Sequence, residues 1–297
     1  MADFFNILVN KLDESLNLQE TRQYGLSILL SEVMISYCIL DFKRNKFLGI
    51  QQIQRSDHSS RNIVPAVKPS LNDFINAVIK AQPWLKNQFK SIQIAYVGEK
   101  VTLIPSQLFD PNEKGNYLQF NFVKEQEEQV FSDHLIPFDT QLVYTVPSVL
   151  IQSMNVHFPN IKIVHFAGIL MNSIWINYKN RINTHRVFLH VRETHFDLLI
   201  YDGRQMNYFN SFPFQSAEDV AYYLIFVLEQ LNFNPETMPL VLLGNVEKGS
   251  AMFELLFKYV RHIEFGHRNE SFKYSHILNQ ISPHAFYPLF NFQSCGL

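Results

Sequence analysis

Apolar and polar residues alternate in two segments that lie far apart in the sequence. Residues 27–47 ("SILLSEVMISYCILDFKRNKF") and residues 187–208 ("VFLHVRETHFDLLIYDGRQMNY") each contain two alternating runs around a short polar tip, then an Asp-led turn and a third run. This period of two predicts three consecutive strands in each segment. Moving the chain along itself by 161 positions places Leu30 on Val191 and Asp41 on Asp202 without a gap. We therefore predict that the chain builds the same strand unit twice.

A helical pattern follows each strand unit. Ser70 and Asp73 in the first copy correspond to Ser216 and Asp219 in the second, and Ser-x-x-Asp before an apolar pattern predicts a capped helix N-terminus. Residues 216 to 231 are apolar nearly all round the helix, which predicts a buried helix. Each helix leads to a short apolar strand that stops at a glycine. A strand after a crossover helix usually runs parallel to its neighbour, so each unit predicts a mixed α/β sheet.

Three further segments complete the predicted elements. The polar stretch from Gln54 to Pro69 predicts a loop inserted in the first copy. Residues 283–297 ("PHAFYPLFNFQSCGL") are densely aromatic; if exposed they would form a docking site, but we expect them to close the core of the first half. Apolar residues near the start recur at helical spacing and predict a helix: Phe5, Leu8, Leu12 and Leu16.

Composition narrows the class of protein. The 297 residues suffice for two domains, and 25 basic against 27 acidic residues give a net charge of −2, which provides no field to gather nucleic acid. Two cysteines are too few for a disulfide framework. The longest apolar run, Ala221 to Leu228, is far shorter than the roughly 20 residues of a membrane span. We expect a cytoplasmic protein without direct membrane insertion.

Two such units facing each other across a central cleft resemble the actin-like ATPase fold, which is ribonuclease H-like. Residues 240–256 ("LVLLGNVEKGSAMFELL") resemble its adenosine loop, and residues 143–174 resemble its linking helix, strand and Ala-Gly-led helix. Residues 101–122 and the acidic stretch 124–129 are similar in order to the actin-like cytoplasmic proteins of pilus and type II secretion platforms. Nearly the whole chain resembles a bacterial family of unknown function with this fold.

The resemblance implies two halves. The first would span residues 1–165, with an inserted segment around 100–145, and the second would span residues 166–297. It also implies a protein partner, which the similarity to secretion platforms would place in a membrane-associated assembly. The identity of that partner and the oligomeric state stay open.

Active members of this superfamily carry Asp-x-Gly at each hairpin tip, where glycine exposes backbone amides to phosphates and the carboxylate serves magnesium. The chain departs from that pattern at both tips and in the adenosine-like loop, where Asn replaces the second glycine. If the second tip keeps a left-handed backbone, Arg192 there costs about 1–2 kcal/mol, whereas Asn245 tolerates that geometry. The candidate residues of a relic cleft are Ser31, Glu32, His190, Arg192, Glu193, Gly244 and Asn245.

These departures predict no catalytic residue and no cofactor, and they disfavour ATP with magnesium. His185, His190 and His195 recur every five residues, so successive imidazoles point to opposite strand faces and predict no metal site. We expect a pseudo-ATPase that acts as an interaction scaffold. One alternative is a nucleotide-binding or weakly active ATPase in which Glu32, Glu193 or Asp197 holds magnesium. Another is a small-anion sensor that uses Arg192.

Overall fold

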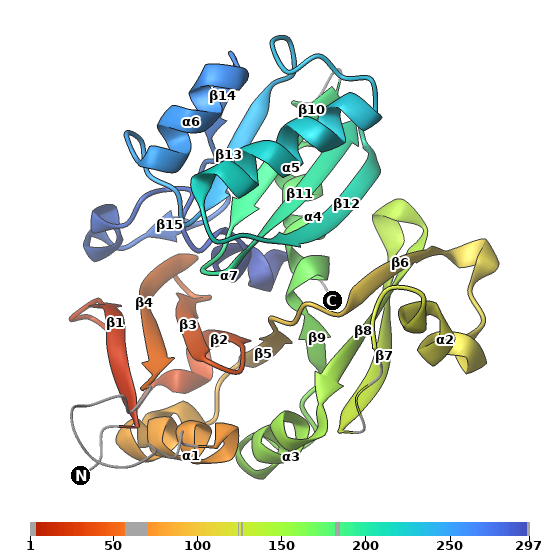
Figure 1. Cartoon of the computed structure of the whole chain (residues 1–297). Helices are drawn as coiled ribbons and strands as arrows, with labels where there is room; N and C mark the ends of the chain where they lie inside the picture. The colour runs from red at the N-terminus through yellow and green to blue at the C-terminus, as the bar shows by residue number, and fades with distance from the viewer. Residues whose placement is uncertain (1–3, 57–69, 124, 126, 182–184, 296–297) are drawn as a thin grey trace, which may run out of the picture. The chain divides into compact units, whose positions relative to one another are not determined.

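The chain forms two compact units in a computed structural model (Figure 1). The structure describes all residues except 1–3, 57–69, 124, 126, 182–184 and 296–297. Unit 1 comprises residues 1–169, 270–280 and 289–297, and unit 2 comprises residues 170–269 and 281–288. The units therefore differ from the predicted halves 1–165 and 166–297, because two C-terminal segments belong to unit 1.

Unit 1 is built on a mixed sheet with the strand order β1-β4-β3-β2-β5-β9. The hairpins β2–β3 and β3–β4 are antiparallel, and β5 runs parallel to β2 after the helix α1 (Leu71–Ala81). The short strand β15 (Lys273–Tyr274) also pairs with β4. The strands of the main path are β1 (Phe5–Leu12), β2 (Tyr24–Leu30), β3 (Met34–Asp41), β4 (Lys46–Arg55), β5 (Ser91–Tyr96) and β9 (Ile163–His165).

The predicted N-terminal helix is wrong, because residues 5–12 form the strand β1. Its backbone pairs antiparallel with β4, with a bulge between Ile7 and Val9. The apolar spacing that resembles a helix leaves Ile7 and Leu8 about half exposed, at 47% and 52%. Hydrogen bonds to a strand more than 35 residues away decide the conformation here, and local periodicity does not report such bonds.

A second, three-stranded sheet occupies the stretch of the predicted inserted segment. Its order is β6-β8-β7, and the helix α2 (Lys114–Gln119) lies between β6 and β7 in the chain. Lys100 joins the acidic stretch to this region, because its Nζ lies 2.6 Å from Glu125 and 3.0 Å from Glu128. The strands are β6 (Val101–Pro105), β7 (Glu128–Leu135) and β8 (Thr140–Pro147), and the helix α3 (Ser148–His157) follows.

Unit 2 has a five-stranded sheet in the order β12-β11-β10-β13-β14. This order and the strand directions match β4-β3-β2-β5-β9 of unit 1. The offset of 161 places β2 and β3 on β10 and β11 residue for residue. The strands are β10 (His185–Val191), β11 (His195–Asp202), β12 (Gln205–Pro213), β13 (Leu240–Gly244) and β14 (Ile263–Phe265), and the helices are α5 (Ala217–Gln230) and α6 (Ala251–Tyr259). The boundary between the two units falls within the helix α4 (Phe166–Tyr178).

Both predicted helix starts are confirmed. The Ser70 hydroxyl accepts a hydrogen bond from the Asp73 amide at 3.1 Å, and the Ser216 hydroxyl accepts one from the Asp219 amide at 3.3 Å. In each pair the aspartate carboxylate accepts a hydrogen bond from the serine amide in return. These capping boxes fix where α1 and α5 begin, beside the sheet that each helix covers.

The helix α5 buries one face and exposes another. Its inner face joins β10, β11 and β13 in the core of unit 2 through Val220, Leu224, Val227 and Leu228. The prediction of a helix buried all round is wrong for the opposite face, where Tyr222 is 63% exposed. The helix therefore carries more apolar side chains than the core of unit 2 buries.

Residues 289–295 of the aromatic tail pack into unit 1, whereas its residues 283–288 belong to unit 2. Phe290 and Phe292 are buried, and the Phe290 ring meets Phe47 of β4 edge-on at 5.1 Å. The Cys38 thiol on β3 donates to the Leu289 carbonyl. The segment around Phe290 and Phe292 thus closes the core of unit 1, as predicted. The alternative prediction of an exposed docking site is wrong for these residues. Residues 57–69 of the predicted inserted loop lie outside the described residues, as do 296 and 297.

Within the described ranges, none of the helices combines the length and the apolar character needed to cross a bilayer.

Candidate functional site

The second hairpin tip, between β10 and β11, carries three of the predicted site residues. The strands remain paired as far as Val191 and Phe196, and the Arg192 amide donates to the His195 carbonyl at 2.8 Å to close the turn. None of the tip residues 192–194 has a positive φ. The tip therefore does not need a left-handed backbone at Arg192, and the steric cost that such a backbone would carry does not arise.

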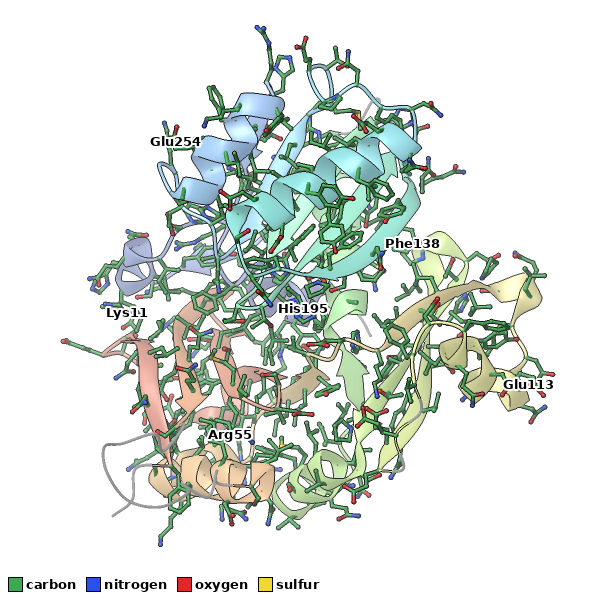
Figure 2. The ribbon with its side chains drawn as sticks, in the orientation of Figure 1. Lys11, Arg55, Glu113, Phe138, His195 and Glu254 are labelled. Carbon is green, nitrogen blue, oxygen red and sulfur yellow. The ribbon has the colours of Figure 1, made fainter. Side chains whose placement is uncertain are left out.

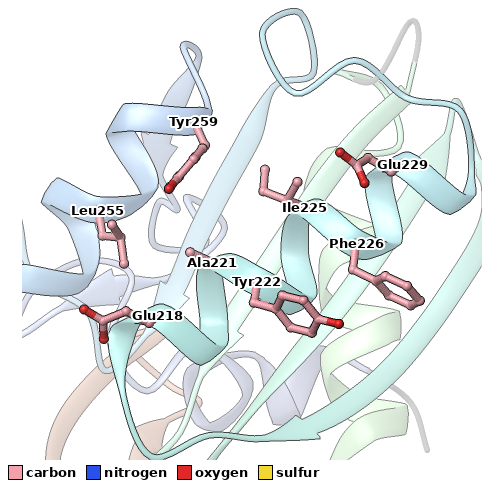
Figure 3. Close-up of a pocket in the computed structure, with 8 residues that line it drawn as sticks. All are labelled: Glu218, Ala221, Tyr222, Ile225, Phe226, Glu229, Leu255 and Tyr259. Carbon is pink, nitrogen blue, oxygen red and sulfur yellow. The ribbon is translucent and has the colours of Figure 1, made fainter.

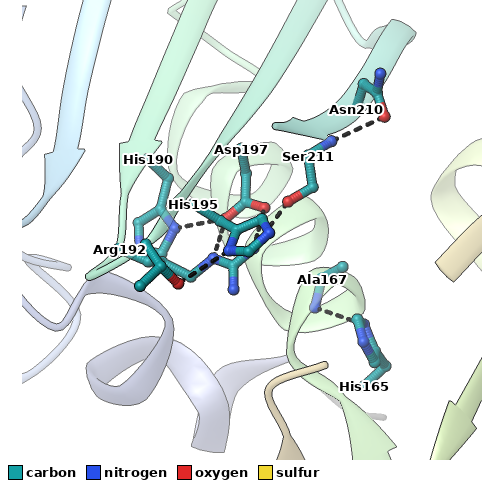
Figure 4. A network of polar contacts seen from close by, with 9 residues as sticks. His165, Ala167, His190, Arg192, His195, Asp197, Asn210 and Ser211 are labelled. Atoms are coloured by element: carbon teal, nitrogen blue, oxygen red, sulfur yellow. Dashed lines mark hydrogen bonds and ion pairs between the residues drawn. The ribbon is translucent and has the colours of Figure 1, made fainter. Parts of the chain in front are cut away.

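Asp197 is the centre of a polar network beside this tip (Figure 4). It lies opposite His190 on β10 and opposite Ser211 on β12, so the three side chains share one level of three adjacent strands. His190 Nδ1 is 3.0 Å from Asp197 Oδ2. Arg192 reaches back from the tip, with Nε 3.1 Å from Oδ2, and Nη2 3.1 Å from Oδ1 and 2.8 Å from the Ser211 hydroxyl.

The network holds a fully buried negative charge. Asp197 has no exposed side-chain area, and Arg192 is only 12% exposed. Burial raises the pKa of Asp197, but the positive charge of Arg192 and the contact with His190 outweigh it and lower the pKa to about 2. Asp197 is therefore ionised at neutral pH, and the two-point contact with the guanidinium is charge-assisted.

The adenosine-like loop is joined to the same tip. The Asn245 amide donates to the Val191 carbonyl at 2.8 Å, and Asn245 Nδ2 donates to Glu193 Oε1 at 3.2 Å. Gly244 has a φ of +80°, and a Cβ at this position would overlap the Val191 carbonyl. The left-handed residue of this turn is thus Gly244 and not Asn245, so the turn does not use the tolerance of Asn for that geometry. The glycine allows close approach of the chain's own backbone.

The helix α6 begins with a side-chain cap at Ser250. The Ser250 hydroxyl accepts a hydrogen bond from the Phe253 amide at 3.2 Å. The preceding Gly249 has a φ of +81° and open space around its Cα. The loop between β13 and α6 therefore turns at two glycines, one of which is crowded and one of which is not.

The first hairpin tip belongs to unit 1 and has a different construction. The Ser31 amide donates to the Met34 carbonyl at 2.8 Å, and the Ser31 hydroxyl accepts from the Val33 amide at 3.3 Å. Glu32 is exposed at the tip. The structure thus groups His190, Arg192, Glu193, Gly244 and Asn245 within unit 2, whereas Ser31 and Glu32 form a separate tip in unit 1.

The sequence predicts Asp197 only as a magnesium ligand in one alternative, and it does not predict Ser211 as a site residue. The signal for Asp197 was a single acid within the apolar run "HFDLLIY" of a predicted strand. A carboxylate in a buried strand requires a charged partner, and Arg192 at the tip is the nearest cation in the sequence. Ser211 gave no comparable signal, since its role depends on the register between β11 and β12.

The donor set does not fit a magnesium site. Both Asp197 oxygens already accept contacts from Arg192, and Glu193 Oε1 accepts from Asn245. Magnesium takes oxygen ligands, and a guanidinium beside the carboxylate repels it. Over the residues that the structure describes, His, Cys, Asp and Glu side chains form no group of three or more suited to a metal ion. His185 and His190 contact different aspartates, Asp202 and Asp197.

Comparison with known proteins identifies the family. The model of the DUF3822 family, described as a protein of unknown function, matches residues 13–263. The chain belongs to this family. No curated protein matches it. A solved structure from Bacteroides thetaiotaomicron, described as a protein with actin-like ATPase fold and unknown function, is 21% identical with a TM-score of 0.76, over 94% of this chain and 99% of that one.

A second solved structure is similar over most of its length. It is described as a PilM–PilN type IV pilus biogenesis complex and is 10% identical, with a TM-score of 0.63, over 92% of this chain and 98% of that chain. At these identities the likeness concerns the fold. The fold class predicted from the sequence, an actin-like ATPase fold with two mixed sheets, is confirmed, and so is the resemblance to a family of unknown function.

Proposed function

We propose that this DUF3822 protein is an actin-like interaction protein that does not turn over ATP. The observation that carries the proposal is the contact between Arg192 and Asp197. The residues that correspond to Asp-x-Gly at the second tip are His190, Val191 and Arg192, and the carboxylate beside them is buried and already neutralised. Freeing Asp197 for a metal would require separating two buried opposite charges, which is costly.

A protein partner is the second part of the proposal. One solved structure with a similar fold is described as a PilM–PilN complex, which is an assembly of proteins. That likeness supports a role of the fold in binding other proteins. The partner of this chain would be a protein, and a membrane-associated assembly is the setting that we propose for it.

Calorimetry with ATP and magnesium tests the first part. We expect no binding heat from the unaltered protein and no rise in its melting temperature, since a ligand at about 100 times its Kd stabilises the folded state by about 2.7 kcal/mol. Micromolar binding of ATP would instead favour the alternative of rearranged phosphate ligands. In that case Glu32→Gln and Glu193→Gln variants would identify which carboxylate takes part.

A double variant tests whether Arg192 blocks the tip. Arg192→Gly alone leaves Asp197 as an uncompensated buried charge, so Asp197→Asn is added to remove that charge. ATP binding by the double variant and not by the unaltered protein would support blockage by the guanidinium. A titration with inorganic phosphate addresses the small-anion alternative, which receives less support because Arg192 already binds Asp197 and Ser211.

A further inference from the structure

An apolar groove lies between α5 and α6 of unit 2 (Figure 3). Its volume is about 320 Å³. Six of the lining residues come from α5 and two from α6, and the apolar members greatly outnumber the charged ones. The lining residues are Glu218, Ala221, Tyr222, Ile225, Phe226, Glu229, Leu255 and Tyr259.

The groove exposes aromatic side chains that the core does not use. Tyr222 is 63% exposed, Phe226 is 45% exposed and Tyr259 is 51% exposed. The rings of Tyr222 and Phe226 stack at 6.1 Å, one helical turn apart on α5. Single exposed apolar residues are common on protein surfaces, whereas a contiguous group that lines a groove indicates a binding surface.

Two acidic residues lie toward the ends of the groove. Glu218 and Glu229 are both exposed and are eleven positions apart on α5, which corresponds to about 17 Å along the helix axis. In the described part of the chain, neither carboxylate forms an ion pair with another residue. Figure 3 shows them near opposite ends of α5, with the aromatic residues between them. The groove therefore has an apolar floor and a negative charge at each end.

We propose that this groove binds an amphipathic helix of a partner protein that carries two Lys or Arg residues about three helical turns apart. An apolar row of the helix would contact Tyr222, Phe226 and Leu255, as in helix-in-groove recognition. Its two cations would lie beside Glu218 and Glu229 and would fix the register of binding. The groove would be the binding surface for the partner protein of the proposed function. It rests on that function only because both require that this chain binds a protein.

A second copy of this chain does not supply such a helix. Within the described residues, each of the helices α1 to α6, and the short helix α7 (Tyr287–Asn291), contains at most one Lys or Arg. The described helices of a second copy therefore do not provide two cations at the required spacing. This composition favours a heterologous partner over self-association through the groove.

Binding of a synthetic helix to the full chain tests the proposal. The probe is a fluorescent peptide of about eighteen residues with leucines on one face and two lysines eleven positions apart. Fluorescence anisotropy should give micromolar affinity, and a matched peptide with glutamates in place of the lysines should bind about tenfold more weakly. Equal affinity for the two peptides, or no binding of the lysine peptide, would overturn the proposal.

Charge exchange makes the test specific to the groove. The variant Glu218→Lys with Glu229→Lys should prefer the glutamate peptide, and the variant with glutamine at both positions should lose the discrimination between peptides. The control is Glu254→Lys, an exposed position on α6 outside the groove (Figure 2), which should keep the original preference. A preference unchanged by the exchange would rule out these two carboxylates as the recognition elements.

An apolar variant completes the experiment. Phe226→Ala should weaken binding about tenfold or more, whereas Phe257→Ala should not, because Phe257 is 57% exposed and lies outside the groove. Sedimentation over a range of concentrations identifies self-association; a dimer lost on Phe226→Ala would replace the proposed partner with a second copy. None of these variants alters Arg192 or Asp197, so failure here is separate from failure of the nucleotide test.

Discussion

Arg192 binds Asp197 through two parallel contacts, Nε to Oδ2 and Nη2 to Oδ1, each 3.1 Å long. Asp197 has no exposed side-chain area, so the guanidinium supplies the charge contact that water supplies to an exposed carboxylate. This contact joins a hairpin tip to the middle of the sheet of unit 2. It connects Arg192 at the tip to a buried position of the sheet, whereas Glu193 and Thr194 at the same tip are exposed.

We expect Arg192→Ala to lower the free energy of unfolding by about 3–5 kcal/mol, because it leaves a buried charge without its partner. Urea denaturation measures the change. Arg204→Ala is the matched control: Arg204 is exposed and, among the described residues, makes one long contact, 3.4 Å to Asn180. Its effect should stay within about 0.5 kcal/mol. Equal effects of the two substitutions would contradict the structural role of Arg192.

The ionised state of Asp197 predicts a loss of stability in acid. Its pKa is lowered from 3.8 to about 2 on folding. A depressed folded pKa contributes stability that is present above about pH 4 and is lost as pH falls through about 2. The contribution is about 2 kcal/mol. Asp13, whose pKa is also lowered on folding, adds to the acid sensitivity of the whole chain in the same direction.

The Asp197→Asn variant isolates this contribution. Its free energy of unfolding should fall less between pH 4 and pH 2 than that of the unaltered protein, since the amide does not titrate. Urea denaturation at several pH values gives the two slopes. Parallel slopes would show that folding does not lower the pKa of Asp197.

Local signals were sufficient for the strand units and the helix starts. The alternating runs around Leu30 and Val191 predicted hairpins with the observed offset, and Ser70 and Ser216 predicted caps that the structure contains. Each of these features depends on residues that are close in sequence. A single chain therefore carries enough information to predict them.

Features that depend on contacts between residues far apart in the sequence could not be predicted from local patterns. Residues 5–12 have a helical spacing, yet they pair with β4. The apolar run of α5 does not reveal which face the sheet leaves uncovered, so Tyr222 was expected in the core. The central position of Asp197 in the site depends on the register between β10, β11 and β12, which the sequence alone does not specify.

The tail should contribute to the stability of unit 1. Phe290 is 3% exposed and packs against Phe47 and Tyr274. Phe290→Ala removes a buried ring and should cost about 3–5 kcal/mol. The control is Phe120→Ala, at a position that is 86% exposed, which should change the free energy of unfolding by less than about 0.5 kcal/mol. Comparable small effects in both variants would mean that the tail does not close the core.

Gly244 and Gly249 provide a matched pair that separates backbone strain from steric overlap. Both have a left-handed φ, +80° and +81°, so alanine at either position should cost about 1 kcal/mol from conformation alone. At Gly249 the added Cβ meets open space, whereas at Gly244 it would overlap the Val191 carbonyl, which also accepts the Asn245 amide. Gly244→Ala must therefore displace the backbone of β10 or of the loop and break that hydrogen bond.

We expect Gly244→Ala to lower the free energy of unfolding by about 3 kcal/mol or more, and Gly249→Ala by about 1 kcal/mol. Urea denaturation of the two variants measures the difference, which reports the overlap with Val191 because the conformational cost is shared. Similar values for both variants would mean that the loop after β13 does not approach the hairpin tip closely. The close approach would then not explain why glycine occupies position 244.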